Sequence, residues 1–142
     1  MSQLADPIAR LREINQMAAF NRWCGIEVVH AEPGAAEIAM PWRAELGQYA
    51  GFLHAGLVGA LIDTACGFAA ATMVGRVLAS HYSVNCLRAA VGERFVAKAR
   101  VVKHGQSMVF TACELYAQAT EGEKLVATGE TLLSVVKDGP RA

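Results

Sequence analysis

One ionisable residue, Asp63, interrupts the apolar run from Leu57 to Val74. On a helix the run divides into two faces. One face has the spacing of a helix packed into a core (Leu57, Leu61, Ala65 and Phe68), and the face that carries Asp63 consists of small residues (Gly56, Gly59, Ala60, Gly67 and Ala70). A carboxylate on such a face loses water, which raises its pKa unless it finds partners. Because this arrangement is costly for stability alone, Asp63 is the first candidate functional residue.

The start of the same helix offers complementary chemistry. At Ala55 and Gly56, free backbone N–H groups and the positive end of the helix dipole favour an oxyanion that develops on a substrate. Hydrolysis at a carbonyl group needs such donors and an activated water or a nucleophile. At about 1.5 Å per residue, however, Asp63 lies roughly 12 Å along the helix, too far to act on the same carbonyl within one subunit.

Two simpler interpretations compete with a functional Asp63. An apolar run of about 18 residues can cross a bilayer, but Gly and Ala supply much of this run, and the segments after it are typical of strands. The helix can also be a buried one whose Asp caps or pairs with a neighbour, since structural ion pairs perturb carboxylates as well.

Composition narrows the class of protein. The 142 residues predict one domain, 1–142. The 13 basic and 13 acidic residues balance, so the basic footprint of a nucleic-acid-binding protein is missing. A hydrophobic content of 54% with 18% charged residues is high for a small soluble monomer and indicates a subunit interface. The N-terminal residues show no apolar signal-peptide region, and we expect a cytoplasmic protein.

The four cysteines, Cys24, Cys66, Cys86 and Cys113, are scattered along the chain without a C-x-x-C pair. This spacing favours neither a metal site nor a disulfide framework. We therefore expect no metal and four cysteines that act as small buried hydrophobes.

The remaining pattern predicts an α+β fold. Asp6-Pro7 begins one amphipathic helix that extends to about Asn21. Strands at 26–31 and 36–40 follow, then a loop from Pro41 to Phe52 and the long helix, which ends at Gly75. Further strands are expected at 80–90, 94–104, 107–119 and 125–136, with a hairpin loop at 120–124 and a tail at 138–142. A single apolar helix followed by an antiparallel meander must pack against that sheet, and one long helix wrapped by a curved sheet fits best.

The loop before the long helix resembles a known family. The run Gln48-Tyr49-Ala50-Gly51-Phe52-Leu53-His54-Ala55-Gly56, with Asp63 nine residues after His54, is similar to the hotdog-fold acyl-CoA thioesterases. The phenylacetate-degradation-type branch, with a pattern near N-x-x-G-x-x-H-G-G-x-x-x-x-x-x-D, looks closest. The strand 82–87 and the turn 103–106 extend the resemblance over nearly the whole chain.

The resemblance implies roles at the matching positions. Asp63 corresponds to the catalytic carboxylate, which acts as general base for water or as nucleophile on the thioester carbonyl. The N–H at Ala55 would polarise that carbonyl; Ala replaces the usual Gly there, which restricts φ. Gln48 replaces the usual Asn, and its amide can orient water or the carbonyl. His54 is expected to hydrogen-bond within the loop, with an independent general-base role as the alternative.

Substrate contacts follow from the same comparison. His81 lies where relatives often carry a small hydroxyl residue that lines the pocket, and Tyr49 and Phe52 suggest a medium-chain or aromatic acyl group. The only cofactor-like group expected is coenzyme A, as part of the substrate. Its phosphates would need cations, and Arg88, Lys98, Arg100, Lys103 and His104 are available, but charged residues on edge strands also block aggregation. The sequence assigns none of them.

Family members are back-to-back dimers in which Asp63 of one subunit would face the loop and helix start of the other. The resemblance therefore implies a homodimer or a dimer of dimers with the active site at the subunit interface. Two other functions stay open: a hydratase or dehydratase acting on acyl thioesters, and a non-catalytic acyl-CoA-binding or regulatory module.

Overall fold

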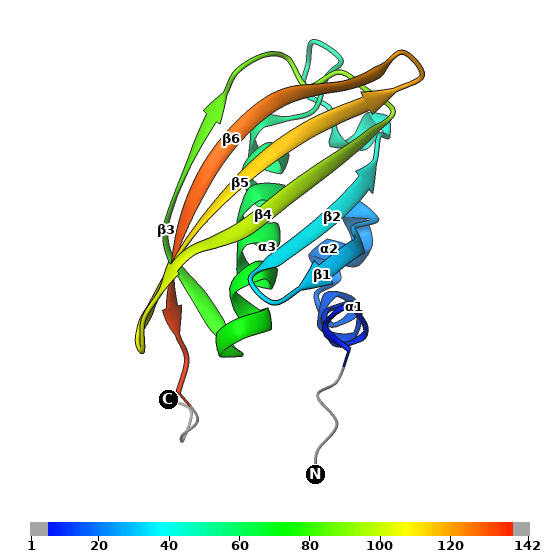
Figure 1. The fold of residues 1–142 in the computed structure, drawn as a ribbon. Helices are drawn as coiled ribbons and strands as arrows, with labels where there is room; N and C mark the ends of the chain where they lie inside the picture. Colours follow the sequence, from blue (N-terminus) through cyan, green and yellow to red (C-terminus); the bar gives the residue numbers. More distant parts are fainter. Residues whose placement is uncertain (1–5, 138–142) are drawn as a thin grey trace.

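A six-stranded antiparallel sheet curves around one long helix in the computed structural model, which describes residues 6–137 (Figure 1). The strands are β1 (Glu27–Glu32), β2 (Ala35–Pro41), β3 (Val77–Cys86), β4 (Arg94–His104), β5 (Met108–Ala119) and β6 (Gly122–Val135). Their order in the sheet is β1-β2-β4-β5-β6-β3. The predicted α+β fold, a long helix wrapped by a curved antiparallel sheet, is confirmed.

The long helix α3 (Ala55–Val74) lies in the concave face of the sheet and contacts all six strands. Leu61, Ile62, Ala65 and Cys66 are fully buried between the helix and the sheet. Helix α3 can approach the sheet closely because Gly129 of β6 has no side chain. A Cβ at Gly129 would lie 2.7 Å from Ile62 Cγ2 and 2.7 Å from the carbonyl oxygen of Ser83. By length and composition α3 could cross a membrane, but half of its most apolar window is buried inside this fold.

The N-terminal segment forms two helices, α1 (Pro7–Met17) and α2 (Ala19–Cys24), instead of the one predicted helix. Asp6 caps α1 as expected, accepting a hydrogen bond from Ile8 N at 3.3 Å. The break falls at Ala18, whose backbone is extended (ψ 114°). Two buried amides hold the bend: Asn15 Nδ2 donates to Ile26 O at 2.8 Å, and Asn21 Nδ2 donates to Asn15 Oδ1 at 3.0 Å. These polar side chains need partners in the core, and the kink supplies them.

Strand β3 differs most from its prediction. It covers Val77–Cys86 instead of 80–90, and it pairs with β6 and not with β4, so the last four strands are not a simple meander. The strand ends early because Leu87 N and Arg88 N both donate to Val126 O, at 2.9 and 3.3 Å, and the chain then leaves the ladder. The connection 87–93 then runs across one end of the curved sheet to reach β4.

Other boundaries agree with the sequence within a few residues. Strand β4 is as predicted, and Gly75, at φ 80°, ends α3. A short 3₁₀ helix, η1 (Ala44–Leu46), lies inside the predicted loop before α3. The β5–β6 turn is tighter than predicted, since β6 already begins at Gly122. The predicted tail 138–142 lies outside the described residues.

The two edges of the sheet differ in how they are covered. At the β1 edge, α1 packs against the strand and Arg12 Nε donates to Val28 O at 3.2 Å. At the β3 edge no described element follows, and nearly every β3 residue is exposed, including Leu78 at 67% and Tyr82 at 49%. Unpaired edges of this kind readily pair with another strand.

Candidate active site

The loop 47–54 is held rigidly at the start of α3. An isolated antiparallel bridge joins Gly47 and Leu53, and Gln48 N donates to Phe52 O at 2.8 Å. Gly51 makes the tight turn between them at φ 85°, a backbone conformation that favours glycine. His54 N then donates to Leu46 O at 3.0 Å, which anchors the loop on the buried Leu46.

His54 is the N-cap of α3. Its Nδ1 accepts a hydrogen bond from Gly56 N at 2.8 Å, and its carbonyl oxygen accepts from Leu57 N and Val58 N at 2.9 and 3.1 Å. Three of the four N–H groups at the helix start are therefore engaged. Within residues 6–137, Ala55 N remains without an acceptor. Of the two predicted oxyanion donors, Ala55 and Gly56, only Ala55 is free.

A cavity of about 330 Å³ opens beside this helix start. Its wall includes Gln48 and Phe52 from the loop, Ala55 and Val58 from α3, and Cys86 from the end of β3. Gln48 lines the cavity, and its Oε1 atom accepts a hydrogen bond from Ala50 N, so its side-chain amino group stays available as a donor. The cavity thus combines an apolar wall with donors from Ala55 and Gln48.

Asp63 lies two turns along α3 and does not line this cavity. It is half-buried, and desolvation raises the pKa of its carboxyl above the ordinary value, with no hydrogen bond or charge from residues 6–137 to offset it. The rise of an α-helix places it about 12 Å from the Ala55 N–H. One protomer therefore keeps the carboxylate and the donors apart.

Two predicted substrate contacts do not reach the cavity within one protomer. Tyr49 is 103% exposed and projects into solvent. His81 is exposed and pairs with Leu132, whereas its neighbour Tyr82 pairs with the buried Thr131 and lies against Gly59 of α3. Phe52 does line the cavity. The substrate roles of Tyr49 and His81 stay predictions, and Tyr82 is a residue near the site that sequence reasoning missed.

The cysteines divide into two groups. Cys24, Cys66 and Cys113 are buried as expected, but Cys86 is exposed at the cavity wall, which corrects its prediction as a buried hydrophobe. Across the described part of the chain, no three His, Cys, Asp or Glu side chains converge to hold a metal ion.

Substitutions of His54 can test whether turnover depends on its Nδ1 atom, which caps α3, or on its Nε2 atom. Asn places its Oδ1 near the position of Nδ1 and is a good N-cap, whereas Gln extends to the region of Nε2. We expect His54→Asn to retain turnover within about threefold, because it keeps the cap and hence the Ala55 N–H in place. His54→Gln and His54→Ala should lower kcat on the order of 10²-fold, the scale of a lost oxyanion donor. Steady-state kinetics of the three variants measure this.

The alternative for His54 predicts another result. If the imidazole itself transfers a proton, His54→Asn will be as inactive as His54→Ala. Circular dichroism of each variant checks that α3 is still formed.

Comparison with known proteins identifies a family for this chain and solved structures with a similar fold. A family model described as the thioesterase superfamily matches residues 50–130. The crystal structure of a thioesterase family protein from Silicibacter pomeroyi is 32% identical and has a TM-score of 0.90, with 94% of this chain and 100% of that chain covered. The structure of a thioesterase from Haemophilus influenzae, 23% identical with a TM-score of 0.78, covers 89% of this chain and 90% of its own and supports the fold. A curated protein of Saccharolobus solfataricus whose name carries a provisional esterase assignment is 25% identical over 114 residues, 78% of this chain and 81% of that protein.

Proposed function

The chain belongs to the thioesterase superfamily and has the hotdog fold of a thioester hydrolase, and from this premise we propose that it hydrolyses acyl-coenzyme A to a free acid and coenzyme A. The observation that carries the proposal is the Ala55 N–H at the start of α3, which has no acceptor within residues 6–137 and belongs to a residue that lines a mostly apolar cavity beside Gln48. A thioester carbonyl bound there would receive the donors that stabilise its oxyanion.

The carboxylate of Asp63 supplies the second half of the chemistry. As general base it takes a proton from water while the water oxygen attacks the thioester carbon, and the carbonyl oxygen gains charge facing Ala55 N–H. The tetrahedral intermediate then expels the thiolate of coenzyme A, which receives the proton from Asp63. In the nucleophilic variant of the proposal, the carboxylate attacks the thioester carbon and expels the thiolate of coenzyme A, and water then cleaves the resulting anhydride. Desolvation raises the pKa of the Asp63 carboxyl, which makes its carboxylate a stronger base than an exposed one.

Because Ala55 and Asp63 lie far apart within one chain, we propose that two subunits share each active site. We place Asp63 of one subunit against the loop and helix start of a second copy, because about 12 Å of helix lies between the two groups in a single chain. The free edge of β3 supports a particular arrangement: pairing β3 with β3 of the second copy would satisfy its open backbone groups and cover Leu78 and Tyr82. Pairing of two dimers into a tetramer is compatible with this arrangement.

The acyl group is proposed from the shape and chemistry of the cavity. Phe52, Leu53, Val58 and Val126 give it an apolar wall, and its volume of about 330 Å³ suits a medium-chain or aromatic acyl group. The phenylacetate-degradation-type branch and the cytoplasmic location stay predictions.

Release of thiol from a panel of short, medium, long and aromatic acyl-CoAs tests the proposal. We expect turnover with the medium-chain or aromatic members. Cys86 is a free and exposed thiol, so each assay needs a blank of protein alone. If no member of the panel is cleaved while calorimetry detects tight binding, the protein is an acyl-CoA-binding module instead. Hydration of an enoyl-CoA without thiol release would indicate a hydratase.

A further inference from the structure

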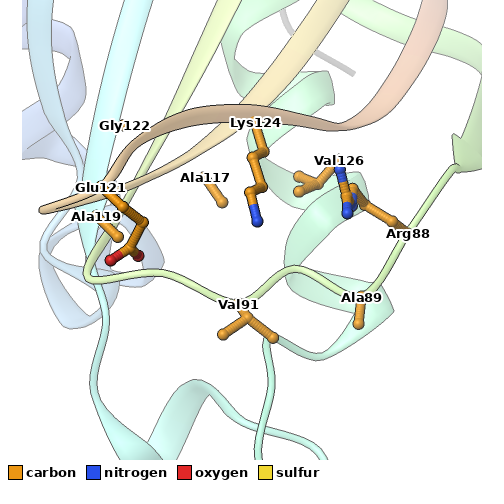
Figure 2. A pocket seen from close by; sticks show the side chains of 9 residues that line it. All are labelled: Arg88, Ala89, Val91, Ala117, Ala119, Glu121, Gly122, Lys124 and Val126. Atoms are coloured by element: carbon orange, nitrogen blue, oxygen red, sulfur yellow. The ribbon is translucent and has the colours of Figure 1, made fainter.

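A second cavity, of about 370 Å³ and shown in Figure 2, shares lining residues with the first. It lies between the β5–β6 hairpin and the connection 87–93 that leads from β3 to β4. Arg88, Ala89 and Val126 line both cavities, so the two are adjacent, and we call them together the groove. A substrate whose carbonyl lies at Ala55 can therefore extend its leaving group past Arg88 into the second cavity.

Two cations face this second cavity. Lys124 projects into it from β6 and Arg88 projects from the crossing connection, so that the two side chains enter from different walls (Figure 2). Neither forms an ion pair with another residue in the range 6–137, where the salt bridges are His30–Glu32, Arg43–Glu45 and Lys98–Glu123. The rest of the wall near them is apolar, with Val91 and Ala117. Unpaired cations beside an apolar wall are suited to bind an anion.

The acidic residue of this cavity indicates where the anion lies. Glu121 stands at the tip of the hairpin, at the far end of the cavity from Arg88 (Figure 2). Its carboxylate would repel a phosphate at that end. The favourable position is between Arg88 and Lys124.

The other cations of the sequence are not available here. Lys98 pairs with Glu123 at 3.9 Å and lies 4.9 Å from the centre of the Tyr116 ring. Arg100, Lys103 and His104 lie toward the far end of β4 and line neither cavity. At about 3.3 Å per residue, His104 is roughly 33 Å from the start of that strand. Of the five cations considered from the sequence, Arg88 alone faces the groove, and Lys124 was not among them.

We propose that Arg88 and Lys124 bind the phosphates of the coenzyme A leaving group and thereby select a phosphorylated thiol carrier; this rests on the proposed function. Arg88 can hold a phosphate through two parallel hydrogen bonds, and Lys124 adds a point charge from a different wall. The groove thus has an acyl end at Phe52, a reacting centre at Ala55 and a phosphate end at Lys124.

Two substrates that differ only in phosphate test this assignment. We compare acyl-CoA with the matching acyl-pantetheine, which has the same thioester without phosphates, in the wild type, Lys124→Gln, Arg88→Gln and the double variant. Each single variant should lower the ratio of kcat/KM for acyl-CoA to that for acyl-pantetheine about tenfold, as expected for a lost charge-assisted bond. Lys103→Gln, the matched control at the far end of β4, should leave the ratio unchanged.

Salt gives an independent sign of the same contact. Raising the ionic strength should raise KM for acyl-CoA in the wild type and have less effect in the double variant, because screening acts on the charges that the double variant lacks. An unchanged ratio in Lys124→Gln and Arg88→Gln overturns the proposal, and so does an equal loss with both substrates, which would indicate a structural role.

Failure of the proposed function is recognised separately. If the wild type cleaves neither substrate, the labelling rate of the exposed Cys86 by a maleimide still reports occupancy of the groove. Desulfo-coenzyme A, which lacks the thiol, should slow this labelling in the wild type and not in the double variant. No protection in the wild type, or equal protection in both, overturns the phosphate site whatever the catalytic result.

Discussion

Asp63→Asn should lower kcat on the order of 10²- to 10⁴-fold with every acyl-CoA that the wild type cleaves, the usual scale for general acid–base catalysis. The amide keeps the size of the side chain but cannot take a proton from water or attack the carbonyl. KM should change little, because the amide keeps the size of the side chain and the proton transfer that it abolishes occurs only in the transition state. Steady-state thiol release measures both constants.

The matched control is Asp63→Glu, which keeps a carboxylate and displaces it by one methylene. We expect it to retain much more activity than Asp63→Asn. Turnover that survives unchanged in Asp63→Asn would remove Asp63 from the mechanism and leave it as a residue of helix packing.

The same substitution should raise stability at neutral pH. Burial raises the pKa of the Asp63 carboxyl in the folded chain above its unfolded value, so the folded state binds the proton more tightly. Stability therefore decreases as pH rises from the unfolded pKa through the folded one. Asp63→Asn removes this cost, and its Tm should exceed that of the wild type at pH 7 by more than at pH 4.

The activity of the wild type should fall as pH drops through the raised pKa of Asp63, because the carboxylate that acts as the base becomes protonated.

Charges placed on the free edge of β3 should separate the subunits and abolish turnover. In Leu78→Lys/Ser83→Lys, two exposed positions of β3 receive cations. If β3 pairs with β3 of the second copy, these cations lie at the contact between the two strands, and lysines on an edge strand oppose pairing. Light scattering should show a change from the dimer mass to the chain mass, with a loss of kcat of at least about 10²-fold because Ala55 and Asp63 no longer meet.

A matched pair on another exposed turn controls for added charge. Val102→Lys/Ser107→Lys introduces the same two cations at the β4–β5 hairpin and should leave the dimer and the activity intact. An active monomer of Leu78→Lys/Ser83→Lys would contradict the shared site.

Sequence patterns predict the fold well where one period dominates. The alternation of β4 and the apolar spacing of α3 give elements whose positions the structure confirms. Sequence patterns fail where buried polar groups or irregular strand pairing decide the geometry. The Asn15–Asn21 contact bends the N-terminal helix at Ala18, and no local pattern reveals that these two amides meet.

The candidate site shows the same limit at single residues. A bulge between Ala79 and His81 shifts the register of β3 against β6, and a one-residue shift exchanges the two faces of a strand. Tyr82 faces α3 for this reason, and His81 faces away. The loop motif located Ala55, Gly56 and His54 together, but only coordinates show that His54 Nδ1 already occupies Gly56 N. Lys124 comes from a hairpin 69 residues after Ala55, so its approach to the groove depends on the tertiary fold.

Mixed dimers test most directly whether two subunits share the active site. Differently tagged chains allow a dimer of Asp63→Asn with His54→Ala to be purified and compared with a dimer of wild type with the double variant Asp63→Asn/His54→Ala. In a shared site, the first dimer has one intact loop facing one intact Asp63 and should show about half of the wild-type activity, whereas the second has no intact site and should be inactive. If the second dimer is active and the first is not, each subunit carries a complete site and the account is contradicted.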